Sequence, residues 1–388
     1  MNTLQKEKRA ILGLSLGHFN IDLYAALLVP LYPLITTKLG INLASISAII
    51  ALGHLVSSMM QPVFGFISDK LRHRVFMVWG LVFSSIFIPL AVKATTTALF
   101  LTCLLLGMLG NAFFHPQVSA LVKEFNKNNP NLSKDMGVFL GLGTIGYAIG
   151  PYLSTFTMGN YGENAFLFLS LIGLTTAIFI YFFVPKKPAK ESYEKGNFFK
   201  IMFEILKNKT CVYLTFISTI KSAISISFGT YIPFLLKNQG FSLDSTGIIV
   251  TLFFISGGLA TIFSSKIENK IGANGVVVLS FLSILPLVLG FLYTLNYNKI
   301  IACILFILTG FFILLSVGVI LVQAQKTMPQ HTGVVSGVMQ GFSWGLGALF
   351  LAPLGIIGQN FGVEKILILM ASIAFVVGLY SAKAKRIS

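Results

Sequence analysis

The chain has 388 residues, of which 55% are hydrophobic and 10% are charged, whereas soluble domains carry about 25% charged residues. Together with a mean hydropathy of +0.85, this composition excludes an ordinary soluble globular protein. A net charge of +16 would suggest nucleic acid as the partner of a soluble protein. Here the basic residues lie between long apolar runs, so we expect a lipid bilayer and no nucleic acid as the partner.

Apolar runs long enough to cross a membrane follow one another along the chain, since each span needs about 20 residues. The first six cover approximately 10–36, 44–67, 75–92, 98–122, 136–158 and 164–184. A polar stretch with seven lysines and three glutamates follows at 185–209. The last six cover approximately 210–236, 245–264, 275–295, 300–323, 333–357 and 365–382. We therefore expect an all-α integral membrane protein with twelve transmembrane helices.

The lysines and arginines divide unevenly between two sets of alternating loops. With the N-terminus inside, the inner segments hold 22 of them, and the outer loops hold five, namely Lys38, Lys93, Lys237, Lys299 and Lys365. Positive residues concentrate on the cytoplasmic side of membrane proteins. We therefore predict a multi-pass protein of the inner (plasma) membrane with both termini in the cytoplasm. The first apolar run exceeds signal-peptide length, so we expect it to remain as a helix.

The second half of the chain repeats landmarks of the first. Gly137–Gly141 and Gly333–Gly337 share the pattern of a glycine at each end, and Asp69-Lys70 has a counterpart in Asn269-Lys270 about 200 residues later. Parallel repeats of six helices are the arrangement of the major-facilitator fold. We therefore expect two six-helix pseudo-repeat bundles joined by a cytoplasmic linker, over 1–184, 185–209 and 210–388.

A loop motif follows the second apolar run. Gly65-Phe-Ile-Ser-Asp69-Lys70-Leu-Arg72-His73-Arg74 resembles the loop signature of the major facilitator superfamily, Gly-x-x-x-Asp-Arg-x-Gly-Arg-Arg. Four positions match, and Arg72 stands where the pattern has glycine; the matching residues are Gly65, Asp69, Lys70 and Arg74. The resemblance implies an inner gate, and a carboxylate among cations can hold helix ends together. The alternative is a basic loop that only enforces topology.

A second motif, Gly146-Tyr-Ala-Ile-Gly150-Pro151, resembles the glycine–proline motif of the antiporters in that superfamily. The resemblance implies export rather than import. Glycines at four-residue spacing also let helices approach closely in any membrane protein. A packing role for Gly146 and Gly150, with Pro151 bending the helix, therefore remains the alternative.

A narrower resemblance rests on three segments of the first half. Gly17–Tyr24, Ser57-Ser58 with Gln61-Pro62, and Phe114-His115-Pro116 are similar to the fosmidomycin-resistance branch of the superfamily. The resemblance covers the first half well and the second half mainly through the glycine pattern of the eleventh run. It implies a drug-exporting proton antiporter, without naming the substrate.

Two ionisable residues in the first apolar run are candidates for proton coupling. A charge at the centre of a bilayer costs at least about 2.5–3.5 kcal/mol, so such residues are functional candidates. His18 and Asp22 are four residues apart, hence on one face of a helix, and imidazole exchanges protons near neutral pH. We predict that Asp22 is the proton site and that His18 tunes it. A purely structural pair, or direct binding of substrate by Asp22, are the alternatives.

Other polar residues within the apolar runs are candidates for a substrate cavity. Lys221 would pair with Asp22 in one conformation or bind an anionic substrate such as a phosphonate, and the alternative is local pairing at a helix bend. His115 precedes Pro116, so it would satisfy a free backbone carbonyl or face the cavity. Further candidates are Gln61, Asn111, Tyr24 and Gln340.

The sequence contains no phosphate-binding Gly-x-x-x-x-Gly-Lys-Ser/Thr loop, no metal-ligand spacing and no Ser-His-Asp arrangement. We therefore expect neither an enzyme nor a cofactor or metal site. The prediction is a secondary active transporter, monomeric in function, that exports a small molecule or drug in exchange for protons by alternating access. The alternatives are an importer of a sugar, amino acid or organic acid, and a membrane scaffold that transports nothing.

Overall fold

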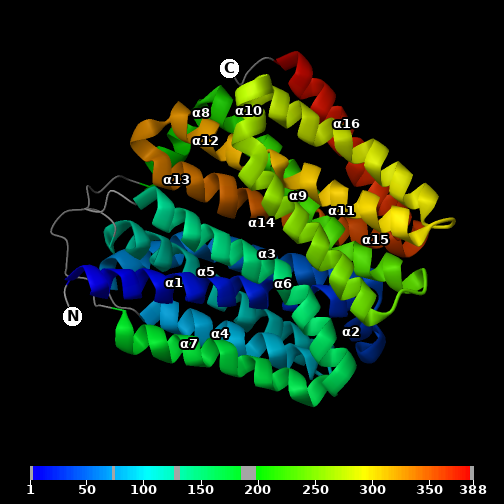
Figure 1. The fold of residues 1–388 in the computed structure, drawn as a ribbon, viewed down its shortest axis with the longest axis horizontal. Coiled ribbons are helices and arrows are strands. Elements are labelled where there is room, and N and C mark those ends of the chain that lie inside the picture. The colour runs from blue at the N-terminus through cyan, green and yellow to red at the C-terminus, as the bar shows by residue number, and fades with distance from the viewer. Residues whose placement is uncertain (1–2, 72–74, 126–131, 185–197, 385–388) are drawn as a thin grey trace. The chain divides into compact units, whose positions relative to one another are not determined.

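The computed structural model describes residues 3–71, 75–125, 132–184 and 198–384. Within these ranges the chain forms helices and short turns, with no β-strand (Figure 1). The helices up to residue 184 are α1 (Thr3–Leu27), α2 (Tyr32–Leu39), α3 (Leu43–Leu71), α4 (Val75–Val92), α5 (Thr97–Phe125), α6 (Leu132–Phe166) and α7 (Ser170–Phe183). The later helices are α8 (Phe198–Lys207), α9 (Lys209–Asn238), α10 (Leu243–Thr294), α11 (Lys299–Leu315), α12 (Val317–Thr327), α13 (Thr332–Gly337), α14 (Ser343–Ala348), α15 (Leu351–Phe361) and α16 (Val363–Ala384).

The number of membrane spans depends on two glycines. In the described ranges, ten helical segments are long and apolar enough to cross a bilayer. Two of them, Val138–Phe183 and Leu243–Thr294, have 46 and 52 residues, about twice what one span needs. Each contains a glycine at positive φ, Gly162 at 73° and Gly272 at 74°, a conformation that ends a helix. Divided at these turns, the described chain has twelve spans, and the predicted all-helical membrane fold is confirmed.

Several spans that the sequence predicts as continuous helices are interrupted. The first breaks at the 3-10 turn Val29–Leu31, because Pro30 has no N–H for the helix ladder. The tenth breaks at Ser316, between α11 and α12. The eleventh contains a π-helical turn over Val338–Phe342. The stretch 185–209, which the sequence predicts as a linker, contains helix α8 in its second part.

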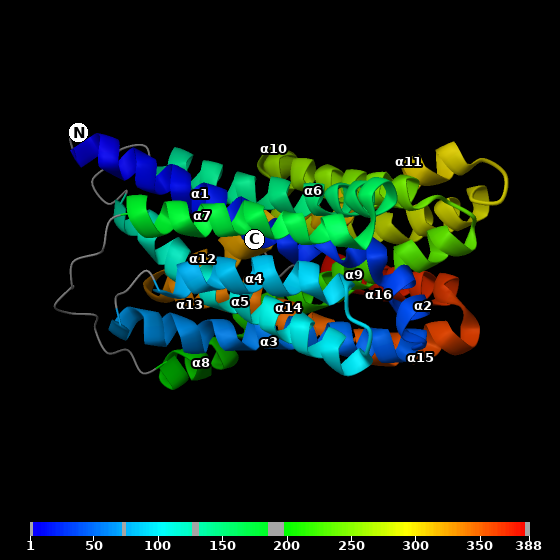
Figure 2. The same cartoon turned by 90° about the horizontal axis from the view of Figure 1, so that it is seen from below.

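The helices group into two compact units. Unit 1 consists of Met1–Ile41, Leu52–Ser192 and Phe241–Thr251, and unit 2 of Asn42–Ala51, Tyr193–Gly240 and Leu252–Ser388. The first turns of α3 are thus grouped with unit 2, and the first turns of α10 with unit 1. In unit 1, α1 packs against α6 and α7 (Figure 2).

Side-chain contacts bring alternate loops to one end of unit 1. Lys38, in the last turn of α2, forms an ion pair with Glu163 at 2.8 Å. Lys93, after α4, donates to Asn164 at 2.6 Å. Both acceptors directly follow the turn at Gly162. The polypeptide therefore crosses unit 1 back and forth between these loops and the opposite end. The polar residues His18 and Asp22 of α1 lie away from these loops, in the packed interior of the unit.

Candidate functional site

The first predicted pair of site residues meets on α1. His18 Nε2 lies 3.2 Å from Asp22 Oδ2, and the two side chains are 8% and 18% exposed. A spacing of four residues places both side chains on one helix face, as the sequence predicts. Leu14 and Ile21 of the same helix belong to the buried apolar core of unit 1.

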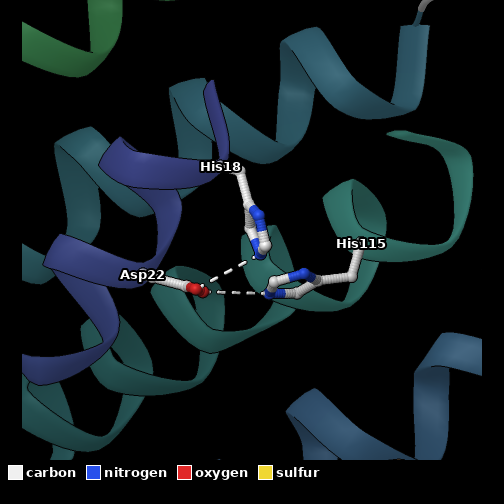
Figure 3. Close-up of side chains that lie close together, drawn as sticks. All are labelled: His18, Asp22 and His115. Atoms are coloured by element: carbon white, nitrogen blue, oxygen red, sulfur yellow. Dashed lines mark ion pairs between the residues drawn. The ribbon is translucent and has the colours of Figure 1, made fainter. Parts of the chain in front are cut away.

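A second histidine reaches the same carboxylate from another helix. His115 Nε2, on α5, lies 3.2 Å from Asp22 Oδ1, and its side chain is 23% exposed. Figure 3 shows the Asp22 carboxylate with one imidazole on each of its oxygens. The two rings are 5.2 Å apart and nearly perpendicular. We call His18, Asp22 and His115 the triad; all three residues belong to unit 1.

Helix α6 fixes the orientation of His18. The ring stacks on Phe139, with centroids 4.2 Å apart and planes 22° from parallel. His18 Nδ1 also lies 2.8 Å from the backbone carbonyl oxygen of Phe139. Because a carbonyl oxygen can only accept a hydrogen bond, Nδ1 is the donor and carries a hydrogen.

This hydrogen bond has a consequence for the other side of the ring. In a neutral imidazole with hydrogen on Nδ1, Nε2 has only a lone pair. That lone pair would face the lone pairs of Asp22 Oδ2 at 3.2 Å. The contact is attractive only when a proton lies between them, either on His18 as imidazolium or on Asp22 as the acid. The geometry of the His18–Asp22 contact therefore fits a pair that shares one proton.

A glycine of α6 makes room for the triad. A Cβ atom on Gly143 would lie 2.5 Å from His18 Cε1 and 2.7 Å from Asp22 Oδ2, well inside ordinary contact distance. The sequence around Gly143 does not predict this role, because the role depends on side chains of another helix. The only available signal was its place on one face with Gly146 and Gly150.

The predicted antiporter-like motif lies in the same interface. A Cβ on Gly146 would collide with the backbone carbonyl of Phe19, and one on Gly150 would lie 2.7 Å from the carbonyl oxygen of Leu23. Both glycines therefore allow α1 and α6 to touch through their backbones. Pro151 is buried in the next position of α6.

The triad also has the composition of a metal site. Its ligand atoms all lie within 4.8 Å of one another, although the sequence shows no metal-ligand spacing, because His115 comes from a distant helix. Both carboxylate oxygens are already engaged by imidazole nitrogens. In this conformation the three side chains form one connected network.

The predicted cavity residues have different surroundings. Tyr24 is fully buried; its hydroxyl donates to the carbonyl of Leu169 at 2.6 Å and accepts from the N–H of Gly173 at 2.9 Å. This placement favours a structural role. Asn111 lies one turn before His115 on α5 and is half-buried, as is Gln61 on α3. Gln340 is exposed in the π-helical turn.

Lys221 lies in the interior of α9, in unit 2, with 6% of its surface exposed. The described residues include no hydrogen-bond or salt-bridge partner for its ammonium group. An unpaired cation inside a membrane span is expensive, and such residues mark ligand or ion pathways.

The gate motif is described only in part. Gly65, Asp69 and Lys70 lie in the last turns of α3, with side chains outside the described part of the structure. Arg74 lies outside the described residues altogether.

Comparison with known proteins agrees with this architecture. A family model for the Major Facilitator Superfamily matches residues 14–352. The fosmidomycin resistance protein of Escherichia coli is 26% identical over 368 residues, which cover 92% of this chain and 88% of that protein. The probable nitrate transporter NarT of Staphylococcus epidermidis is 24% identical over 66% of this chain and 65% of that protein.

A solved structure shows the same fold. The crystal structure of the nucleoside transporter NupG superposes with a TM-score of 0.74 over 98% of each chain, at 15% identity. Both the family model and the fold cover nearly the whole chain. The protein therefore belongs to the major facilitator superfamily and is a multi-pass membrane transporter rather than an enzyme.

Proposed function

We propose that this transporter exports a small molecule or drug in exchange for protons, by alternating access. The fosmidomycin resistance protein, which matches over 92% of the chain, supports export. The observation that carries proton coupling is the contact of His18 Nδ1 with the Phe139 carbonyl, which leaves Nε2 facing the Asp22 carboxylate.

The triad suggests how a proton would enter and leave. His115 is the most exposed of its three side chains, so it would exchange protons with solvent. Asp22 contacts both imidazoles and would pass the proton to His18. Tyr147 of α6 is another titratable group that interacts electrostatically with Asp22. A proton drives transport only through its different affinity for the two conformations, so substrate and proton would have to compete.

The buried cation of unit 2 favours an anionic substrate. Lys221 has no partner among the described residues, and a carboxylate, phosphate or phosphonate group would supply one. The topology that we propose places both termini in the cytoplasm of a cell with the protein in its inner membrane. One chain would suffice for transport, because the triad and Lys221 are both supplied by a single copy.

The substrate can be found by a resistance screen. A host that lacks its own pumps would be grown with and without this gene across a panel of antibiotics that includes fosmidomycin. Purified protein in liposomes would then be given the compound to which it confers resistance, with a pH difference across the membrane. In an antiporter the substrate moves against the proton flow, so it should accumulate in the acidic compartment.

The coupling role is tested by Asp22→Asn. The amide keeps the size of the side chain and a hydrogen-bonding oxygen but cannot take part in the same proton exchange. We expect accumulation driven by the pH difference to be lost, while counterflow without a pH difference continues. Asp244→Asn is the matched control, because Asp244 is an exposed carboxylate in the first turn of α10. Undiminished pH-driven accumulation in Asp22→Asn would exclude the proposed site.

Import is the second candidate. The similarity to a probable nitrate transporter and the unpaired Lys221 both fit uptake of an anion. A proton symporter would accumulate its substrate in the basic compartment of the same liposomes, opposite to an antiporter. The direction of accumulation therefore separates the two functions in one experiment.

A further inference from the structure

An open apolar groove lies on unit 2, between α8, α9 and α16. Its volume is about 650 Å³, within the range of small-molecule pockets, about 300–1,000 Å³. Tyr213 forms part of its floor and donates to Ser381 at 2.8 Å, which joins α9 to α16. Its walls include Leu206, Val212, Phe216, Val376 and Tyr380.

One end of the groove is basic. Lys209, the first residue of α9, is the only charged residue that lines the groove in the described part of the chain. Lys207 and Lys383 are exposed nearby, in the last turns of α8 and α16, although the Lys207 ammonium lies over the Phe203 ring, 4.3 Å from its centroid. Phe216 lies about 10 Å farther along α9, at 1.5 Å per residue. The groove therefore joins a cationic rim to an apolar wall two helical turns deep.

Helix α8 holds the rim in place. Its Ile205 is 2% exposed, whereas Phe203 and Leu206 are 57% and 65% exposed. Glu204 Oε2 lies 3.4 Å from His331 Nε2, which attaches α8 to the turn before α13. A helix with buried, basic and exposed apolar faces is typical of the membrane interface. The groove thus lies at the first residues of the candidate membrane span Lys209–Asn238.

We propose that this groove binds one anionic glycerophospholipid, with its phosphate at Lys209 and one acyl chain along α9 and α16. A basic rim at the end of transmembrane helices is the chemistry that recognises acidic head groups. The open apolar wall, in which Val376 is 64% exposed, complements an acyl chain. Charge and shape together favour a lipid over a neutral apolar ligand. The inference does not depend on the direction of transport or on its coupling ion.

The test is lipid binding by native mass spectrometry of the full, delipidated chain. Phosphatidylglycerol and phosphatidylcholine with identical acyl chains are added in parallel. We expect one phosphatidylglycerol to bind about fivefold more tightly, since a lysine near the head group contributes about fivefold. Lys209→Gln should weaken phosphatidylglycerol about fivefold and leave phosphatidylcholine unchanged. Val376→Trp should weaken both lipids, because the indole fills the wall.

The matched control is Lys365→Gln, which removes an exposed lysine from the opposite end of α16 and should change neither affinity. The proposal is overturned if the two lipids bind equally. It is also overturned if Lys365→Gln weakens phosphatidylglycerol as much as Lys209→Gln, because binding would then follow overall charge. A dimer that disappears in Val376→Trp would identify a second copy of the chain as the occupant and would equally refute the lipid site.

Discussion

Replacing Gly143 by alanine tests the geometry of the triad with a single methyl group. The added Cβ would lie 2.5 Å from His18 Cε1 and 2.7 Å from Asp22 Oδ2, whereas carbon atoms in contact are about 3.5–4.0 Å apart. The two side chains must therefore move by about 1 Å. Their present separation of 3.2 Å is already near the limit for a hydrogen bond, so this movement breaks the contact.

The expected loss follows from the energy of that contact. A hydrogen bond to a charged group contributes about 1.5–3 kcal/mol, and each 1.36 kcal/mol changes a rate or an equilibrium tenfold. We therefore expect Gly143→Ala to lower pH-driven accumulation by about 10- to 150-fold. Stability should fall as well, because overpacking costs about 1–3 kcal/mol in addition to the lost hydrogen bond, while alanine regains only up to about 1 kcal/mol of helix propensity.

The assay compares pH-driven accumulation with counterflow in the same proteoliposomes, so that loss of coupling is separated from loss of protein. Gly141→Ala is the control on the same helix, because a Cβ there meets no atom within 4 Å. It should retain coupling and unfold at the same temperature or a higher one. If Gly143→Ala couples as well as Gly141→Ala, the close packing of α6 against the triad has no part in proton transfer.

Three further substitutions probe the surroundings. Tyr24→Phe removes the hydroxyl that donates to Leu169, and chemical denaturation should show a loss of about 2 kcal/mol in unfolding free energy. An unchanged unfolding free energy would contradict the structural role of Tyr24 and favour the predicted role in the substrate cavity. Gln117→Ala removes the side-chain oxygen that accepts from the backbone N–H of Met77, the third residue of α4, at 2.8 Å. We expect the unfolding free energy to fall by about 1–3 kcal/mol and proton coupling to be unchanged. Lys221→Met should keep or raise the unfolding temperature, because a buried unpaired charge is removed. The substitution should also abolish saturable uptake of an anionic substrate into liposomes. Uptake with an unchanged half-saturation concentration would exclude the anion site.

The helical membrane fold follows from apolar runs alone, but the interruptions of those runs do not. Pro30 signals the break after α1 through its missing N–H. Ser316, by contrast, gives no such signal, and the break between α11 and α12 depends on packing. The stretch 185–209 has many lysines and glutamates, which hide the amphipathic pattern of α8. A search for helical periodicity within that stretch would have revealed it.

The triad could be predicted only in part. His18 and Asp22 share a helix, so their spacing determines that they meet. His115 is 93 residues from Asp22 along the chain, and only the Phe-His-Pro resemblance pointed to it. The decisive contact, the Phe139 carbonyl at His18 Nδ1, involves a backbone atom and has no signature in residue type.

The tight packing of α1 on α6 limits how the triad can respond to a proton. Gly146 brings the two backbones into contact at Phe19, and the hydrogen bond to Phe139 fixes the His18 ring on α6. Sliding of one helix along the other would break both contacts, so His18 keeps its orientation within unit 1. The exposed parts of the triad belong to Asp22 and His115, at 18% and 23%. A change in protonation must therefore act through those two side chains and whatever approaches them, and not through deformation of the helix pair that holds His18.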